Sequence, residues 1–283
     1  MMQGTVVGTV VFKEAIEYLP EYLDSLMKQT DQNFSIMLVN DNILPRQLEE
    51  ILAHYPKDFA SRIVVIDKSK DKLQPYMLRV ELLRQAWEQG YELLVIMDCD
   101  DKASASRISC IQEQFDMEYT FFYNELRDFA GEPVMPPLPE YTDNASAISE
   151  SNYLGMSNGA INLKKISLKF ICSLTEGQTR IFDWYFYTRL LLNGARGKKI
   201  QGCYTYYRIY AENIAGTSQC NKAALEKEIQ IKRQHYHLLE HYNKQYEKLA
   251  RYYEKLQIEN IHPQPENGYW WSLIDSSKEE MIL

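Results

Sequence analysis

The chain has 283 residues and a mass of 33.3 kDa, enough for one large domain or two modest ones around a sizeable core. Hydrophobic residues make up 45% and charged residues 25%, which excludes a wholly disordered chain, a collagen and a coiled-coil rod. Acidic residues outnumber basic ones, 39 to 31, so the net charge is −8 and duplex nucleic acid is a poor candidate for the main partner.

The first hundred residues alternate short apolar runs with amphipathic helical patterns. The expected strands are 5–12, 35–39, 63–66 and 93–97, and the expected helices are 18–28, 45–54 and 75–89. The run LLVIM at 93–97 is apolar at every position, which indicates burial on both faces and therefore a parallel sheet covered by helices. The strict alternation predicts a Rossmann-like α/β half with a mostly parallel sheet.

After residue 103 the pattern becomes looser. Helices are expected at 104–115 and 182–193, a strand or hairpin at 119–129 and a strand at 153–161. A strand pair is expected at 199–210 and a proline-containing loop at 131–144. Residues 221–258 contain no proline or glycine and predict a long helix or a helical pair. We expect His235, His237 and His241 of that segment to be solvated, and the Tyr269-Trp270-Trp271 cluster to pack back onto the fold.

The five cysteines are scattered and form no CxxC pair, which predicts reduced thiols rather than a disulfide framework or a zinc ribbon. No apolar run approaches the roughly 18 residues of a membrane span, and no basic segment followed by an apolar one opens the sequence. We therefore expect a cytoplasmic protein, with peripheral contact to a membrane left open.

Chemistry concentrates where the fourth expected strand ends, in Asp98-Cys99-Asp100-Asp101. Ligands of open parallel sheets bind outside the carboxyl ends of strands, and three carboxylates within four residues repel one another unless a cation is near. An all-oxygen ligand set suits Mg²⁺ or Mn²⁺, with further ligands from a diphosphate-bearing substrate. Asp41 ends the second expected strand at the same edge, where it is either a nucleotide contact or an ordinary turn residue.

Several familiar motifs are absent. No GxGxxG follows the first strand, and neither GxxxxGK[ST] nor GxSxG occurs. The sequence therefore argues against a dinucleotide oxidoreductase of the usual kind, a P-loop phosphotransferase and an α/β-hydrolase nucleophile elbow.

Four segments stand in one order along the chain: VVGTVVFKEAIEYLPEYLDSLMKQTDQNFSIMLVNDN (6–42), LLVIMDCDD (93–101), FDWYFYTRLLLNG (182–194) and YYRIYAENIAG (206–216). The segment 93–101 is similar to a DxD signature, 182–194 to an ED-type helix, and 206–216 to a closing YRxHxxN segment. Together the four resemble the family 2 glycosyltransferases, and this resemblance implies a GT-A fold. It also implies a nucleotide-diphosphate sugar donor, expected to be UDP-linked, and Mn²⁺ or Mg²⁺ as cofactor.

The resemblance carries roles over position by position. Asp41 matches the residue that contacts the nucleotide base, Asp98 a donor-binding carboxylate, and Asp100, with Asp101 beside it, the metal ligands. Asp183 matches the general base that takes a proton from the acceptor hydroxyl, which implies inversion at the anomeric carbon.

Two further assignments are less specific: the resemblance implies one for a donor-side arginine, and position alone gives the other, for the acceptor. Arg79 or Arg84, in the helix before the fourth strand, is expected to approach the nucleotide or the diphosphate. Tyr153, Asn158 and Trp184 are expected to contact the acceptor, a hydroxyl-bearing glycan, glycoconjugate or lipid-linked glycan.

The sequence departs from the family pattern at Phe182, where glutamate is frequent, and at Tyr210, where histidine is usual. These departures keep open the alternative of a catalytically degenerate scaffold subunit. A nucleotidyltransferase is a second alternative, but it would need a glycine-rich basic loop after the first strand, and this sequence has none there. No QxxRW motif is present, which favours single addition over processive synthesis. A metal-dependent hexosyl- or N-acetylhexosaminyltransferase is the leading expectation.

The expected organisation is a GT-A domain over 1–217, divided into a nucleotide-binding half (1–103) and an acceptor half (104–217). Residues 218–283 form a helical extension and tail. The basic, tyrosine-rich part of the extension, 221–258, packs on its own domain, closes the acceptor site, forms a homodimer or rests on an anionic membrane surface; the sequence leaves these alternatives open.

Overall fold

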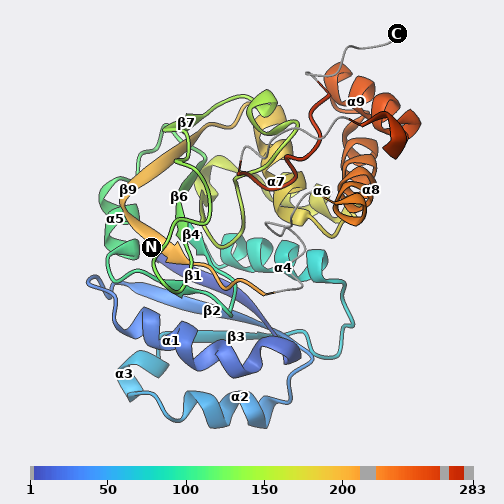
Figure 1. Ribbon diagram of the computed structural model, residues 1–283. Helices are drawn as coiled ribbons and strands as arrows, with labels where there is room; N and C mark the ends of the chain where they lie inside the picture. The colour runs from blue at the N-terminus through green and yellow to red at the C-terminus, as the bar shows by residue number, and fades with distance from the viewer. Residues whose placement is uncertain (1–2, 211–220, 262–267, 277–283) are drawn as a thin grey trace.

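The computed structural model describes residues 3–210, 221–261 and 268–276, and its elements are shown in Figure 1. The first part of the chain alternates strands and helices as the apolar runs predict. Its strands are β1 (Gln3–Phe12), β2 (Phe34–Asp41), β3 (Ile63–Asp67) and β4 (Tyr91–Ile96). Its helices are η1 (Lys13–Tyr18), α1 (Leu19–Met27), α2 (Pro45–Leu52), α3 (Lys57–Ala60) and α4 (Pro75–Glu88).

The second part adds strands to the other side of β4. They are β5 (Lys102–Ala103), β6 (Phe121–Arg127), β7 (Tyr141–Thr142), β8 (Gly159–Asn162) and β9 (Gly197–Tyr206). The helices are α5 (Arg107–Glu113), η2 (Ala145–Ile148), η3 (Leu163–Lys165), α6 (Leu168–Ser173), η4 (Leu174–Glu176), α7 (Phe182–Leu192), α8 (Lys222–Leu239), α9 (Lys244–Lys255) and η5 (Ile258–Asn260).

All described strands form one sheet in the order β3-β2-β1-β4-β8-β6-β9-β5, with β7 paired to β9. The pairs β3-β2, β2-β1 and β1-β4 are parallel, whereas β8 runs antiparallel to β4 and to β6. The expected mostly parallel α/β sheet is confirmed, and the antiparallel β8 makes it a mixed sheet. Because β8 continues the sheet from β4, both expected halves of the domain share one sheet.

Helices cover both faces of this sheet (Figure 1). Val6 belongs to the core layer that includes α4, and Val7 to the layer that includes α1, and neither side chain is exposed. A Cβ added to Gly8 would lie 2.7 Å from a methyl carbon of Leu82, so this glycine lets α4 approach β1 closely. Burial of successive residues on opposite faces explains why the strand is apolar throughout.

Three segments differ from the sequence-based expectation. The expected loop at 131–144 contains the short strand β7 near its end. Residues 153–158 form a loop before β8, because Asn152 and Asn158 accept the backbone N–H groups of Leu154 and Gly155 in local turns. The expected strand pair at 199–210 is instead one strand, β9, whose Gly202 has a φ of +79°, a conformation that glycine adopts readily.

Of the two alternatives predicted over 221–258, a long helix or a helical pair, the pair is confirmed as α8 and α9, which pack beside α7 (Figure 1). The expectation that His235 is solvated is wrong. Its ring is fully buried and stacks on Trp184, with ring centroids 4.1 Å apart, because it lies on the inward face of α8. His237 and His241 are exposed as expected.

The Tyr269-Trp270-Trp271 cluster packs back as expected, and Trp270 pairs with Asn152. None of the helices in the described ranges has the length and apolarity needed to cross a membrane.

Candidate active site

A cavity of about 740 Å³ opens where the carboxyl end of β4 faces the amino end of α7. Its wall includes Asp98 from the end of β4, Arg79 from α4 and Asp183 from the first turn of α7. The segments 155–157 and 178–182 and the tail residues Trp270 and Trp271 complete much of the rim. Two carboxylates that are 85 residues apart in the sequence therefore border one cavity.

Asp98 is held at the cavity by partners on two sides. Its carboxylate forms an ion pair with Arg79, with 3.1 Å between Oδ1 and Nη2, and its backbone N–H donates to the hydroxyl of Ser157. Burial would lower the pKa of the Arg79 guanidinium, but the charges of Asp98 and Asp183 outweigh it and raise that pKa. Arg79 is therefore a fixed positive charge that both carboxylates stabilise.

Asp100 and Asp101 contact the segment that follows β9. Tyr210 donates its hydroxyl to Asp100 over 3.0 Å, and the backbone N–H of Arg208 donates to Asp101 over 2.8 Å. The guanidinium of Arg208 also donates to the backbone carbonyl of Asp100. Tyr210, which stands where the family pattern has histidine, thus does reach the DxD carboxylates, a contact that the departure from the pattern left in doubt. Residues 211–216 of the same motif lie outside the described residues.

Asp100 and Asp101 fit a hard divalent cation. Burial raises the pKa of both carboxyls. The charge of Asp98 raises the pKa of Asp100 further, and the charges of Asp100 and Asp98 raise that of Asp101. Asp101 is 2% exposed, and its Oδ2 has no hydrogen-bond partner in the described part of the chain. No group of three or more His, Cys, Asp and Glu side chains suited to a metal occurs among the described residues, so a bound diphosphate would have to complete the ligand set.

Asp183 lies in the first turn of α7, where it borders the cavity and is half-buried. Its carboxylate accepts the backbone N–H of Trp184 over 2.8 Å. Burial raises the pKa of Asp183 to about 6, while the positive charge of Arg79 opposes the shift. A carboxylate that titrates near neutrality beside a substrate-sized cavity is suited to accept a proton.

Only one of the two arginines expected to approach the donor lines the cavity. Arg79 faces Asp98, whereas Arg84 pairs with Glu81 and Glu88 on its own helix and does not line the cavity. Arg84 follows Arg79 by five positions, a helical rotation of about 500°, so the two side chains leave α4 on different sides.

Asp41 is the last residue of β2, which is separated from β4 by β1, and it does not line the cavity. It is half-buried, and burial and the charge of Glu14 raise its pKa. Its contact with a nucleotide base stays a prediction.

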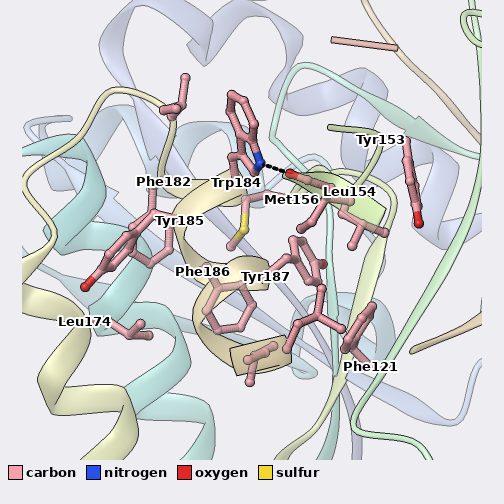
Figure 2. Close-up of a cluster of buried hydrophobic side chains, with 14 of the residues drawn as sticks. Phe121, Tyr153, Leu154, Met156, Leu174, Phe182, Trp184, Tyr185, Phe186 and Tyr187 are labelled. Atoms are coloured by element: carbon pink, nitrogen blue, oxygen red, sulfur yellow. Dashed lines mark hydrogen bonds between the residues drawn. The ribbon is translucent and has the colours of Figure 1, made fainter. Parts of the chain in front are cut away.

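The three residues expected to contact the acceptor are buried and have structural partners. Figure 2 shows Trp184 and Tyr153 among the aromatic side chains of this core. The indole N–H of Trp184 donates to Ile148, the hydroxyl of Tyr153 lies 2.7 Å from that of Thr142, and Asn158 holds the turn at Gly155. None of the three lines the cavity, so the geometry does not support a direct acceptor contact for them.

Sequence reasoning missed Arg180, Tyr207, Trp270 and Trp271 as cavity residues. Two signals were available: the aromatic cluster at 269–271, which predicted packing without a location, and the segment 206–216, which contains Tyr207.

A family profile described as Glycosyl transferase family 2 matches residues 6–134. Residues 6–134 belong to glycosyl transferase family 2. The family 2 region runs from β1 past β6 and contains Asp41, Asp98, Asp100 and Asp101, whereas Asp183 lies beyond it.

Solved structures of glycosyltransferases share the fold. S. aureus TarS 1–349 in complex with UDP-GlcNAc matches with a TM-score of 0.58 and 14% identity, over 89% of this chain and 72% of that one. The mannosyltransferase PcManGT from Pyrobaculum calidifontis, in complex with GDP-Man and Mn²⁺, gives 0.56 and 14%, over 89% and 68%. GalNAc-T7 with UDP, GalNAc and Mn²⁺ gives 0.56 and 12%, over 91% and 52%. At such identities the likeness shows the fold alone, which is GT-A.

A search of curated protein sequences finds no significant match.

Proposed function

We propose that the protein is an inverting, divalent-metal-dependent glycosyltransferase that moves a sugar from a UDP-sugar to a hydroxyl group of a glycan or glycoconjugate. The family 2 region supports transfer from a nucleotide-sugar donor. The observation that carries the rest is that Asp98, at the end of β4, and Asp183, at the start of α7, border one cavity that Arg79, the ion-pair partner of Asp98, also lines.

The donor is expected on the Asp98 side of the cavity. Loss of the nucleoside diphosphate from the sugar builds negative charge on the leaving oxygen, and a positive charge there lowers the barrier. Arg79 supplies a fixed guanidinium next to Asp98, and Arg208 is held by its contacts to Asp100 and Asp101. A Mn²⁺ or Mg²⁺ ion held by Asp100 and Asp101 would supply Lewis-acid stabilisation of the diphosphate.

The acceptor is expected on the Asp183 side. The attacking hydroxyl must lose its proton as its bond to the anomeric carbon forms. Asp183 would accept this proton, a role supported by its place on the cavity wall. A pKa of about 6 leaves this group mostly ionised at neutral pH, yet basic enough to take a proton. One base and one in-line attack would give inversion.

The donor type takes support from the structural neighbours. TarS was crystallised with UDP and with UDP-GlcNAc, and GalNAc-T7 with UDP and GalNAc, whereas PcManGT was crystallised with GDP-Man. We therefore favour UDP and include GDP as the competing nucleotide.

The test is calorimetric titration of UDP and GDP, with Mn²⁺ and with chelator, followed by hydrolysis assays with their sugars. We expect metal-dependent UDP binding that Asp100→Ala abolishes, and slow hydrolysis of one UDP-sugar. The matched control is Asp58→Asn, on the surface of α3, which should behave like the wild type. Failure of every nucleotide to bind under all conditions would refute the proposal and favour the scaffold alternative.

A further inference from the structure

The tail segment 268–276 is fixed to the body of the protein by buried charged groups of α8. The carboxylate of Glu228 accepts the backbone N–H groups of Leu273 and Ile274, at 3.2 and 3.0 Å. The ammonium of Lys232 donates to the carbonyl of Ile274 and pairs with Glu228, and both charged side chains are buried. A buried ion pair that also hydrogen-bonds backbone groups of another segment holds that segment in one position.

The same anchoring brings two indole rings to the cavity. Trp270 exchanges two backbone hydrogen bonds of 2.9 Å with Asn152, and its ring centroid lies 6.1 Å from that of Tyr207. A Cβ added to Gly155 would lie 2.8 Å from the Trp270 ring, so the indole packs directly on the loop that follows Asn152. Both Trp270 and Trp271 line the cavity.

Trp271 has a φ of +61°, in the left-handed region that a bulky side chain rarely adopts. Strain of this kind persists where the surrounding structure holds it, and it gathers at ligand sites. Flat aromatic faces with a polar N–H at the edge suit ligands that are apolar on one side and hydroxylated at the rim, as sugars are.

Arg180 lines the same cavity, three residues before Asp183. It has no ion pair or hydrogen bond among the described residues. Every other arginine donates to a carboxylate, a carbonyl or a hydroxyl group, including those on open surface such as Arg46 and Arg251. In a chain with a net charge of −8, an arginine that is left unpaired at a cavity wall is available for an anionic ligand.

Arg180 belongs to the Asp183 side of the cavity by its place in the chain. The donor side already has Arg79 next to Asp98, and Arg208 next to Asp100. We infer that Trp270, Trp271 and Arg180 form an acceptor subsite for a sugar that carries a negative charge, either a carboxylate or a phosphate. The word "acceptor" rests on the proposed transferase function, whereas the anionic sugar site rests on these three side chains alone.

The test uses three simple sugars as probes on the full chain in the presence of UDP and Mn²⁺. Methyl β-D-glucuronide carries a carboxylate, glucose 6-phosphate carries a phosphate, and methyl β-D-glucoside is neutral. Binding is followed by calorimetry and by quenching of tryptophan fluorescence. We expect one anionic probe to bind about tenfold more tightly than the neutral one, and which one it is distinguishes a uronate from a phosphosugar.

Three variants locate the effect. Arg180→Gln should abolish the preference for the anionic probe and leave UDP affinity unchanged, and Trp270→Ala should weaken binding of every probe. Arg251→Gln removes the same charge from the exposed face of α9, and it should change neither the preference for the anionic probe nor the affinity for UDP. Because the backbone of Trp270 pairs with Asn152, the segment should stay in place without the indole.

Three results would overturn the inference: no sugar binding, equal binding of charged and neutral probes, or a preference that survives in Arg180→Gln. Loss of UDP affinity in Arg180→Gln would also overturn it, because Arg180 would then serve the donor. Binding of the anionic probe by a protein that binds no nucleotide would confirm the sugar site and refute the proposed donor.

Discussion

Asp183→Asn should make the protein less active and more stable at the same time. Burial raises the pKa of Asp183 to about 6, so folding favours the protonated carboxyl. The unfolded chain has a pKa near 3.9, and therefore between about pH 4 and pH 6 the folded state binds more protons. Stability from this group is fully present below pH 4 and is lost as the pH rises through 6.

The magnitude follows from the shift. Two pKa units correspond to about 3 kcal/mol, and because Asp183 borders an open cavity we reduce this to about 1.5 kcal/mol. Asparagine keeps the oxygen that accepts the backbone N–H of Trp184 but carries no charge. The variant should therefore unfold with about 1.5 kcal/mol more free energy at pH 8, and the difference should vanish near pH 4.

Urea denaturation of wild type and variant at pH 4, 6 and 8 measures this, with Asp58→Asn as the control for loss of an exposed carboxylate. Activity gives an independent readout: loss of a general base costs about 10²- to 10⁴-fold in turnover. For the wild type, kcat/KM should fall about tenfold from pH 7 to pH 5 as Asp183 takes up a proton. A variant that is less stable than wild type at pH 8, or that keeps its activity, would refute the reasoning.

Three further predictions address the donor side and the tail. Arg79→Gln should weaken UDP binding by about tenfold or more, because it removes the charge beside Asp98, while Arg84→Gln should leave UDP binding unchanged; calorimetry tests both, and equal losses would contradict the geometry. Tyr210→Phe should raise the Mn²⁺ concentration needed for half-maximal activity by about 10-fold, because Asp100 loses its hydroxyl donor; an unchanged metal titration would show that this contact is idle. Lys232→Met should lower the free energy of unfolding by about 3 kcal/mol, measured by urea denaturation, because it leaves the carboxylate of its ion-pair partner buried without a cation; a loss below about 1 kcal/mol would contradict this.

The parallel half of the fold could be predicted from the sequence because its signal is local. LLVIM at 93–97 is apolar at every position since β4 is buried on both faces, and Pro75 and Gly90 bracket α4 in the expected way. A carboxylate directly after such a strand must lie at the sheet's carboxyl edge, so the place of Asp98 was predictable.

The acceptor half could not be predicted as well, because its side chains are placed by partners distant in the sequence. Trp184 was expected to contact an acceptor, but His235 of α8 stacks on its ring, and the indole is fully buried in the core. The periodicity of α8 shows that one face of the helix is apolar, but it does not show which of the nearby histidines lies on that face. Tyr153 and Asn158 are likewise occupied by Thr142 and by the turn at Gly155.

The sequence by itself determined the alternation of strands and helices, the DxD carboxylates at the end of β4 and the carboxylate at the start of α7, because each depends on residues within one turn or one strand. Only the tertiary structure decided that Arg79 rather than Arg84 faces Asp98, that Tyr210 reaches Asp100, and that the tail's indoles line the cavity. These outcomes depend on which surfaces meet when helices and sheet pack, and on buried pairs such as Glu228 with Lys232, whose spacing along one helix says nothing of the segment they hold.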